Sequence, residues 1–216
     1  MTLLWKHPFT CICAGPSGCG KTTFVLKFLE NLPSMVDSPI EQVVWCCSRG
    51  SEPKIESENK TRVIIRHEIP PFKEFGGSPI LYVIDDLMSE GAYGKDVCKL
   101  FTRGSHHFNI SVFLITQNIF YQSAQSRNIS LNSKYIVVFK NPRDQLQFGH
   151  LARQVYPKKS SELERVFKES TEEAFGYLVL DLGQDTDDRC RFRTKIFPQD
   201  EATVIYVPAH DEKVEK

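Results

Sequence analysis

The chain has no excess of charge of either sign and no apolar run long enough to cross a membrane. Lys plus Arg and Asp plus Glu each number 27 in 216 residues. Any contact with nucleic acid must therefore come from a local patch of positive charge, because the net charge gives no general attraction to phosphate. A membrane-spanning helix needs about 20 consecutive apolar residues, and the apolar runs here are short and interrupted. The N-terminus also lacks a charged-then-apolar targeting pattern, so we expect a soluble intracellular protein.

The seven cysteines lack the paired spacing of a zinc site. Four of them fall in apolar, strand-like runs, where thiols behave as small hydrophobic groups: Cys11, Cys13, Cys46 and Cys47. This usage is typical of a reducing compartment. His106 and His107 likewise lack a partner carboxylate or metal-ligand spacing, and we interpret them as structural or solvent-facing.

A run of nine residues after the first apolar stretch matches every fixed position of a Walker A phosphate loop. It consists of Gly15, Pro16, Ser17, Gly18, Cys19, Gly20, Lys21, Thr22 and Thr23. Glycines let backbone N–H groups converge on phosphate oxygens, and such a loop leads into the positive N-terminal end of a helix. Lys21 adds a cation and Thr22 a hydroxyl for magnesium. The motif therefore predicts that the protein binds a nucleoside triphosphate and Mg²⁺, and the family resemblance given below implies that this nucleotide is ATP.

Apolar runs alternate with helical patterns along the chain, which indicates an α/β fold. The strand-like runs are 9–14, 42–47, 61–66, 80–84, 110–116 and 134–140, and the helical patterns are 23–32, 92–103, 144–155 and 161–168. This alternation predicts a mostly parallel sheet flanked by helices, with the ligand at the carboxyl ends of the strands. Residues 175–182 and 189–197 are separated by a turn-rich stretch and predict a closing C-terminal β-hairpin. We expect one domain over residues 1–208 and a charged tail at 209–216.

Polar side chains follow two of the apolar runs. Asp85 fits the Walker B acid that holds magnesium through water, and Asp86 fits the general base that orients an attacking water. Gln117 comes after the run 110–116, where an amide can face the γ-phosphate and sense its presence. The alternatives, a solvated acidic turn and a polar strand cap, stay open at this point.

Two arginines are candidates for the group that stabilises charge during phosphoryl transfer. A planar guanidinium in that role is worth about 10³ to 10⁵ in rate. Arg103 closes the expected helix before the Gln117 strand, and Arg143 lies in the loop after the next strand. Either could reach the nucleotide of a neighbouring subunit, and each is also compatible with an ordinary surface salt bridge.

Taken together, these segments resemble the poxvirus-type DNA-packaging ATPases of the FtsK/HerA superfamily, which are also found in Maverick/Polinton elements. The resemblance covers nearly the whole chain and rests on the phosphate loop and on residues 84–87, 113–118, 139–144, 151–154 and 176–182. The loop is generic. The Thr-Gln-Asn strand end and the Asn-Pro-Arg-Asp block, in this order, are much more specific.

The resemblance implies a P-loop NTPase with an additional-strand, RecA/FtsK-like sheet, in which the Gln117 strand lies between the phosphate-loop strand and the Asp85 strand. Lys21 and Thr22 would bind phosphate and magnesium, and Asp85 the metal. Asp86 would bind the water and Gln117 the γ-phosphate. Arg103 is the first candidate for the finger that acts in trans, ahead of Arg143.

The same resemblance implies an ATPase that drives double-stranded DNA into a capsid. It implies a homo-oligomeric ring of five or six subunits, a capsid portal or vertex protein as partner, and no membrane. The work would be done inside the host cell, in nucleus or cytoplasm, at sites of virion assembly. Candidate DNA contacts are two basic clusters: Arg49, Lys54, Lys60 and Arg62 around the loop after strand 42–47, and Lys158 with Lys159 before a later helix.

Other classes of nucleotide-binding protein fit less well. An ABC transporter ATPase needs a Leu-Ser-Gly-Gly-Gln signature and a Glu after the Walker B Asp, and neither is present. A small-molecule or nucleoside kinase would need an acceptor pocket under an arginine-rich lid. Arg189, Arg191 and Arg193 are the clustered candidates, and their alternate spacing suggests one face of a strand. A helicase or translocase not tied to packaging remains an alternative.

Overall fold

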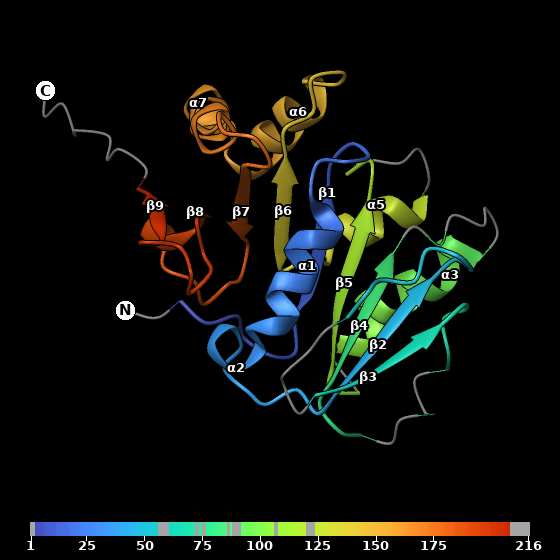
Figure 1. Ribbon diagram of the computed structural model, residues 1–216. Coiled ribbons are helices and arrows are strands. Elements are labelled where there is room, and N and C mark those ends of the chain that lie inside the picture. Colours follow the sequence, from blue (N-terminus) through green and yellow to red (C-terminus); the bar gives the residue numbers. More distant parts are fainter. Residues whose placement is uncertain are drawn as a thin grey trace, which may run out of the picture.

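A computed structural model describes residues 3–55, 61–71, 74, 77–85, 87, 92–105, 108–119 and 124–207 of the chain. Within these residues one sheet has the strand order β3-β2-β4-β5-β1-β6-β7-β8-β9, with helices on both faces (Figure 1). The strands are β1 (Thr10–Ala14), β2 (Gln42–Cys47), β3 (Arg62–Arg66), β4 (Ile80–Asp85), β5 (Ile110–Thr116), β6 (Tyr135–Phe139), β7 (Tyr177–Asp181), β8 (Phe192–Thr194) and β9 (Val204–Tyr206). The mixed α/β fold with a mostly parallel sheet is confirmed.

The helices begin and end close to the predicted patterns. They are α1 (Lys21–Glu30), α2 (Leu32–Met35), α3 (Ala92–Lys99) continuing into the π-helical η2 (Leu100–Gly104), α5 (Ala124–Leu131), α6 (Leu146–Val155), η3 (Pro157–Lys159), α7 (Ser160–Ser170) and η4 (Asp188–Cys190). The helix α5 was not predicted. Its sequence is rich in Ser, Asn and Gln, which are weak signals for a helix. None of the helices described is long and apolar enough to span a membrane.

The sheet separates two hydrophobic cores, because side chains alternate between its faces along each strand. Cys11 and Cys13 of β1 pack with α1 and α2, while Ile12 and Ala14 pack with α3, α5, α6 and α7. Both faces of the central strands are therefore covered, which explains why their sequences read as continuous apolar runs. All seven cysteines are free, and the four in strands are buried, as predicted. Burial raises the pKa of the Cys46 thiol to about 12.

The order of the central strands places the predicted site residues at one edge of the sheet. β5 lies between β1 and β4 and pairs with both in parallel. The predicted additional-strand order is therefore confirmed. Parallel neighbours end at the same edge, so the residues that follow β1, β4, β5 and β6 gather there.

The C-terminal part of the sheet is antiparallel. β7 pairs with β6 and with β8, and the β7–β8 pairing confirms the predicted hairpin. Two details differ from the prediction. β8 is shorter than residues 189–197 because η4 occupies Asp188–Cys190, and an unpredicted strand, β9, adds an edge. β9 has only three residues and is largely exposed, so its sequence is too short to show the hydrophobic alternation that predicts a strand.

Candidate nucleotide-binding site

The phosphate loop links the carboxyl end of β1 to the N-terminus of α1. Gly18 and Gly20 have φ angles of 77° and 102°, in the left-handed region that favours glycine. Gly15 meets a different constraint, because a Cβ there would lie 2.7 Å from Cys19 Sγ and 2.8 Å from Phe139 Cβ. No side chain caps α1, so its first backbone N–H groups are available to an anion. The loop therefore fits a phosphate group.

Lys21 lies inside this loop. Its Nζ donates hydrogen bonds to the carbonyl oxygens of Gly15 at 2.7 Å and Pro16 at 2.9 Å, and only 9% of the residue is exposed. The ammonium group is thus held among the backbone groups of the loop itself. Phosphate oxygens bound by the loop would therefore lie close to this positive charge.

Thr22 and Asp85 lie together, although they come from separate segments. The Thr22 hydroxyl donates to Asp85 Oδ2 at 3.4 Å, and Asp85 is the last residue of β4. A hydroxyl and a carboxylate fit magnesium, which is bound by one or two carboxylates together with waters and substrate phosphates. No cluster of three or more His, Cys, Asp or Glu side chains occurs in the described part of the chain, so an all-protein metal cage is not formed there. Asp86 lies outside the described residues.

Gln117 follows β5 and lies beside the phosphate loop. The strands place Ala14 opposite Thr116, and the Gly15 N–H donates to the Thr116 carbonyl at 3.2 Å. Gln117 is exposed and lines, together with Gly15, a cavity of about 570 Å³. Because β5 separates β1 from β4, Gln117 comes between the strand that leads to Lys21 and the strand that ends at Asp85.

A hydrogen-bond network joins the strand end that holds Gln117 to the Asn-Pro-Arg-Asp block. Gln147 of α6 donates to Asn118 Oδ1 at 2.9 Å and to Asp144 Oδ2 at 2.8 Å, and its side-chain oxygen accepts from the Ile119 N–H at 3.2 Å. Asn141 Oδ1 in turn accepts from the Arg143 and Asp144 N–H groups. Sequence reasoning missed Gln147. Its position three residues after Asp144 has the spacing of a capping box, and that signal could have identified it.

The two candidate arginines lie at opposite ends of the sheet. Arg143 is exposed in the loop after β6, at the same edge as the phosphate loop. Arg103 is exposed near the start of β5, and nearby Ser105 lines a cavity with Pro8 and Thr10 at the amino ends of the strands. The structure therefore does not bring Arg103 to the phosphate loop of its own chain.

The arginines considered for a kinase lid are engaged elsewhere. Arg189 pairs with Asp187 and Arg191 with Asp188, each at 2.6 Å, on the surface near η4. Arg193 of β8 is 2% exposed and pairs with buried Asp181 at 2.8 Å. The prediction that they share one face of a strand is wrong, because only Arg193 belongs to β8.

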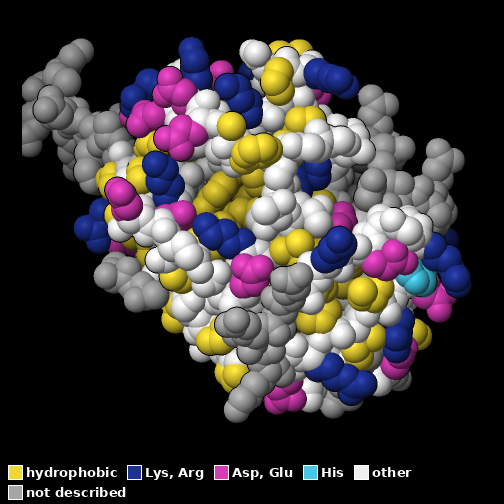
Figure 2. Space-filling model, in the orientation of Figure 1, with side chains coloured by type: hydrophobic (Ala, Val, Ile, Leu, Met, Phe, Trp, Pro, Cys, Tyr) yellow, Lys and Arg dark blue, Asp and Glu magenta, His cyan; other side chains and the backbone are white. Residues whose placement is uncertain are grey.

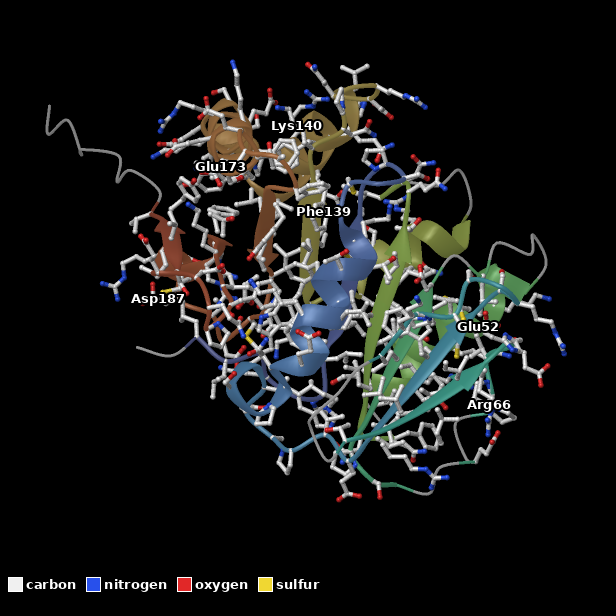
Figure 3. All side chains as sticks on the ribbon, viewed as in Figure 1. Glu52, Arg66, Phe139, Lys140, Glu173 and Asp187 are labelled. Carbon is white, nitrogen blue, oxygen red and sulfur yellow. The ribbon has the colours of Figure 1, made fainter. Side chains whose placement is uncertain are left out.

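The candidate DNA-contacting loop carries charges of both signs. Arg49, Lys54 and Arg62 are exposed, and Lys60 lies outside the described residues. Glu52 of this loop lies 3.6 Å from His67 Nε2, and Figure 3 shows Glu52 and Arg66 near the carboxyl ends of β2 and β3. His106 and His107 also lie outside the described residues.

A larger cavity of about 890 Å³ begins at the N-terminus of α1. On one side it is lined by Lys21, Thr22 and Thr23, and on the other by residues 173–177 and by Lys195. Figure 2 looks onto this hollow between α1 and the C-terminal strands, with hydrophobic side chains in its floor. Tyr177 is fixed there, because its hydroxyl accepts from the Ile196 N–H at 3.0 Å, and burial raises its pKa.

Comparisons with known proteins show similarity in structure only. No protein-family model matches the sequence, and no curated protein matches it. Among solved structures, the genome packaging NTPase B204 from Sulfolobus turreted icosahedral virus 2 in complex with ATP-gammaS matches with a TM-score of 0.55 and 13% identity, over 87% of this chain and 96% of that chain. Its complex with AMPPCP matches with a TM-score of 0.55 and 13% identity, over 94% and 99%. B204, the DNA-packaging ATPase from Sulfolobus Turreted Icosahedral Virus, matches with a TM-score of 0.52 and 13% identity, over 94% and 100%.

These matches extend over nearly the full length of both chains. At this level of identity they establish the arrangement of the backbone. The chain therefore has the mixed α/β fold of these viral genome-packaging NTPases.

Proposed function

We propose that the protein is an ATPase that drives double-stranded viral or transposon DNA into a capsid. The observation that carries this proposal is the convergence of Lys21, the Thr22–Asp85 pair and Gln117 at one edge of an additional-strand sheet. The fold likeness to the genome packaging NTPase B204, solved in complex with ATP-gammaS and with AMPPCP, supports it.

Each residue of this constellation has a separate task. Lys21 and the backbone N–H groups at the start of α1 would bind the phosphates of ATP. The Thr22 hydroxyl and the Asp85 carboxylate would hold Mg²⁺, which supplies positive charge against the phosphates. On sequence grounds we assign Asp86 as the base that orients the attacking water and Gln117 as the amide that meets the γ-phosphate.

We further propose a homo-oligomeric ring of five or six subunits in which an arginine of one subunit completes the site of the next. Arg143 is favoured over Arg103 for this role. It lies at the carboxyl edge of the sheet, in a loop tied through Gln147 to the strand end that holds Gln117. Arg103 lies at the other end of that strand.

The biological setting follows the poxvirus-type and Maverick/Polinton resemblance. We propose a capsid portal or vertex protein as the docking partner, and the nucleus or cytoplasm of the host cell as the place of work. DNA contacts would come from the exposed cations after β2 and from Lys158 and Lys159. Contacts to the DNA backbone alone carry no sequence information, so binding would not depend on DNA sequence.

The decisive test is ATP hydrolysis by the purified protein with and without long double-stranded DNA over a salt series. We expect stimulation by DNA that falls as salt rises, because contacts to phosphates release counterions. Asp86→Asn should retain ATP binding and lose hydrolysis. This variant therefore distinguishes hydrolysis at the proposed site from hydrolysis by a contaminating ATPase. Hydrolysis indifferent to DNA, or phosphoryl transfer to a nucleoside, would contradict the packaging proposal and favour a kinase.

A further inference from the structure

Phe175 is a large aromatic residue that the fold holds out into solvent. The residue is 69% exposed and lines the 890 Å³ cavity. Its backbone φ is 62°, in the left-handed region that residues other than glycine rarely adopt. An exposed aromatic ring forgoes the favourable free energy that its burial would give. A strained backbone conformation persists only where the surrounding structure enforces it. Both features indicate that Phe175 serves something other than the core.

The turn between α7 and β7 fixes the position of this ring. The Gly176 N–H donates to the Glu173 carbonyl at 3.1 Å. A Cβ on Gly176 would lie 2.7 Å from the Ser170 carbonyl oxygen and 2.9 Å from Thr171 Cα, so the turn is tight and needs glycine there. Thr171 is 2% exposed and anchors the turn in the protein. The ring of Phe175 is thereby presented by a rigid support.

The ring lies directly beside the phosphate loop. Phe175 Cδ1 is 3.4 Å and Phe175 Cβ 3.6 Å from the position that a Cβ would occupy on Gly20. Gly20 immediately precedes Lys21 and the first turn of α1, where phosphate would be bound. A flat group attached to a phosphate chain in the loop would therefore meet the ring of Phe175 first.

The cavity has the size and continuity that such a group needs. Its volume lies within the range of about 300–1,000 Å³ that is common for ligand sites. The lining runs from Lys21, Thr22 and Thr23 to Phe175 and Lys195 without a break between phosphate loop and C-terminal strands. Glu173 lies on the α7 side of this hollow (Figure 3). The smaller cavity beside Gln117 shares none of these residues of α1.

We infer that Phe175 is the stacking platform for the base of the bound nucleoside triphosphate, and that this cavity is its base and sugar subsite. The inference rests on the proposed nucleotide-binding function and extends it to a residue that determines affinity. Stacking on an aromatic ring tolerates any base, because every base has a π-face. The platform therefore contributes affinity for the nucleoside part of the ligand, while the loop contributes affinity for phosphate.

The test compares ADP with inorganic tripolyphosphate, which has phosphates and no base. Calorimetric titration of the wild type and of Phe175→Ala should show ADP binding weakened roughly 5- to 150-fold, as alanine substitution of a stacking residue does elsewhere. Tripolyphosphate affinity should stay unchanged. Phe175→Trp should retain ADP affinity, and its added fluorescence should change on binding of ADP and not of tripolyphosphate.

Leu131→Ala is the matched control, because Leu131 is 59% exposed and lies at the opposite end of the sheet, beside Asn132 and Lys134. It should leave both affinities unchanged. Equal ADP affinity in wild type and Phe175→Ala would overturn the inference. An equal loss of affinity for ADP and for tripolyphosphate would also overturn it, because the ring would then only shape the phosphate loop. Phe175-dependent ADP binding without DNA-stimulated hydrolysis would support the subsite and contradict the packaging function. A wild type that binds neither ligand would contradict both.

Discussion

At the scale of single residues, the phosphate loop is constrained by space as much as by conformation. Gly15 has no room for a side chain, since Cys19 and Phe139 occupy the place where its Cβ would lie. Gly77 presents the opposite case, because its φ is 83° and nothing lies within 4 Å of its Cβ position. The two glycines therefore separate the effect of steric overlap from that of backbone strain.

We predict that Gly15→Ala weakens ATP binding at least tenfold and lowers the free energy of unfolding by about 1–3 kcal/mol, the usual effect of overpacking. The inserted methyl group would displace Cys19 or the strand end that carries Phe139. Gly77→Ala should lower stability through strain and leave ATP binding intact. Calorimetric titration and chemical denaturation measure the two quantities. Normal ATP affinity in Gly15→Ala would show that the loop can shift without loss of the site.

Cys19 gives a second prediction at this scale. Burial raises the pKa of its half-buried thiol, and alkylation requires the thiolate. Labelling of Cys19 by iodoacetamide should therefore be slow at pH 7 and accelerate as pH rises past the ordinary thiol range, and saturating ATP should slow it. Peptide mass spectrometry measures the rate. Cys190 in η4 is the internal control and should show no protection by ATP; equal protection of both would indicate a global effect.

At the scale of elements, a buried ion pair joins the C-terminal strands to the rest of the domain. The Arg193 guanidinium donates to Asp181 Oδ2 at 2.8 Å and to the Leu3 carbonyl at 3.4 Å, while Asp181 Oδ1 accepts from Gly183 and Thr186. The side chains of Arg193 and Asp181 are only 2% and 6% exposed. Loss of one partner would leave the other charge buried without compensation.

We predict that Arg193→Ala lowers the free energy of unfolding by about 3–5 kcal/mol, measured by urea denaturation. Arg189→Ala is the control, because its pair with Asp187 lies on the surface, and it should leave the midpoint almost unchanged. Similar small effects of both substitutions would mean that water reaches the buried pair.

The loop after β6 and the end of β5 behave as one element, because Gln147 bonds to both. We predict that Gln147→Leu lowers the kcat of ATP hydrolysis roughly tenfold, since several hydrogen bonds of about 0.5–1.5 kcal/mol each are lost, and leaves KM for ATP unchanged. Gln154→Leu, on an exposed position of the same helix, should have no effect. A rise in KM with unchanged kcat would place Gln147 in nucleotide binding instead of positioning.

At the scale of the whole molecule, the proposed ring predicts complementation between subunits. Lys21→Ala and Arg143→Ala should each be inactive alone. Their mixture should recover hydrolysis, because an intact phosphate loop of one subunit can then meet Arg143 of the other. Mixing Lys21→Ala with Arg103→Ala in the same way tests the other candidate arginine. Arg153→Ala is the control and should be active alone. Recovery with Arg103→Ala and not with Arg143→Ala would reverse the assignment.

The sequence predicted the parts of the site that depend on adjacent residues. The phosphate loop, the strand ending in Asp85 and the strand before Gln117 are local patterns, and the structure confirms their positions. The strand order came from the family resemblance, because pairing between distant strands leaves little trace in periodicity. Phe175 was missed since its neighbour Gly20 comes from a segment far away in the chain, whereas Gln147 was missed although its spacing from Asp144 is a local signal. The prediction that Arg189, Arg191 and Arg193 share one face of a strand was wrong because a spacing of two residues also occurs in turns.

The central place of β1 has a consequence for how the protein is made. β1 is synthesised first, yet both its neighbours arrive about a hundred residues later, as the Cys11–Phe113 and Cys11–Tyr135 pairings show. Such non-local pairing slows folding, because the entropy of closing a long loop is lost before any native contact offsets it. A nascent chain that has not yet released β5 from the ribosome therefore has the complete phosphate-loop sequence but neither of the strands that pair with β1. The proposed nucleotide site can therefore form only after β5 and β6 have been synthesised, and ATP present during translation would stabilise the folded protein without directing the first steps of its folding.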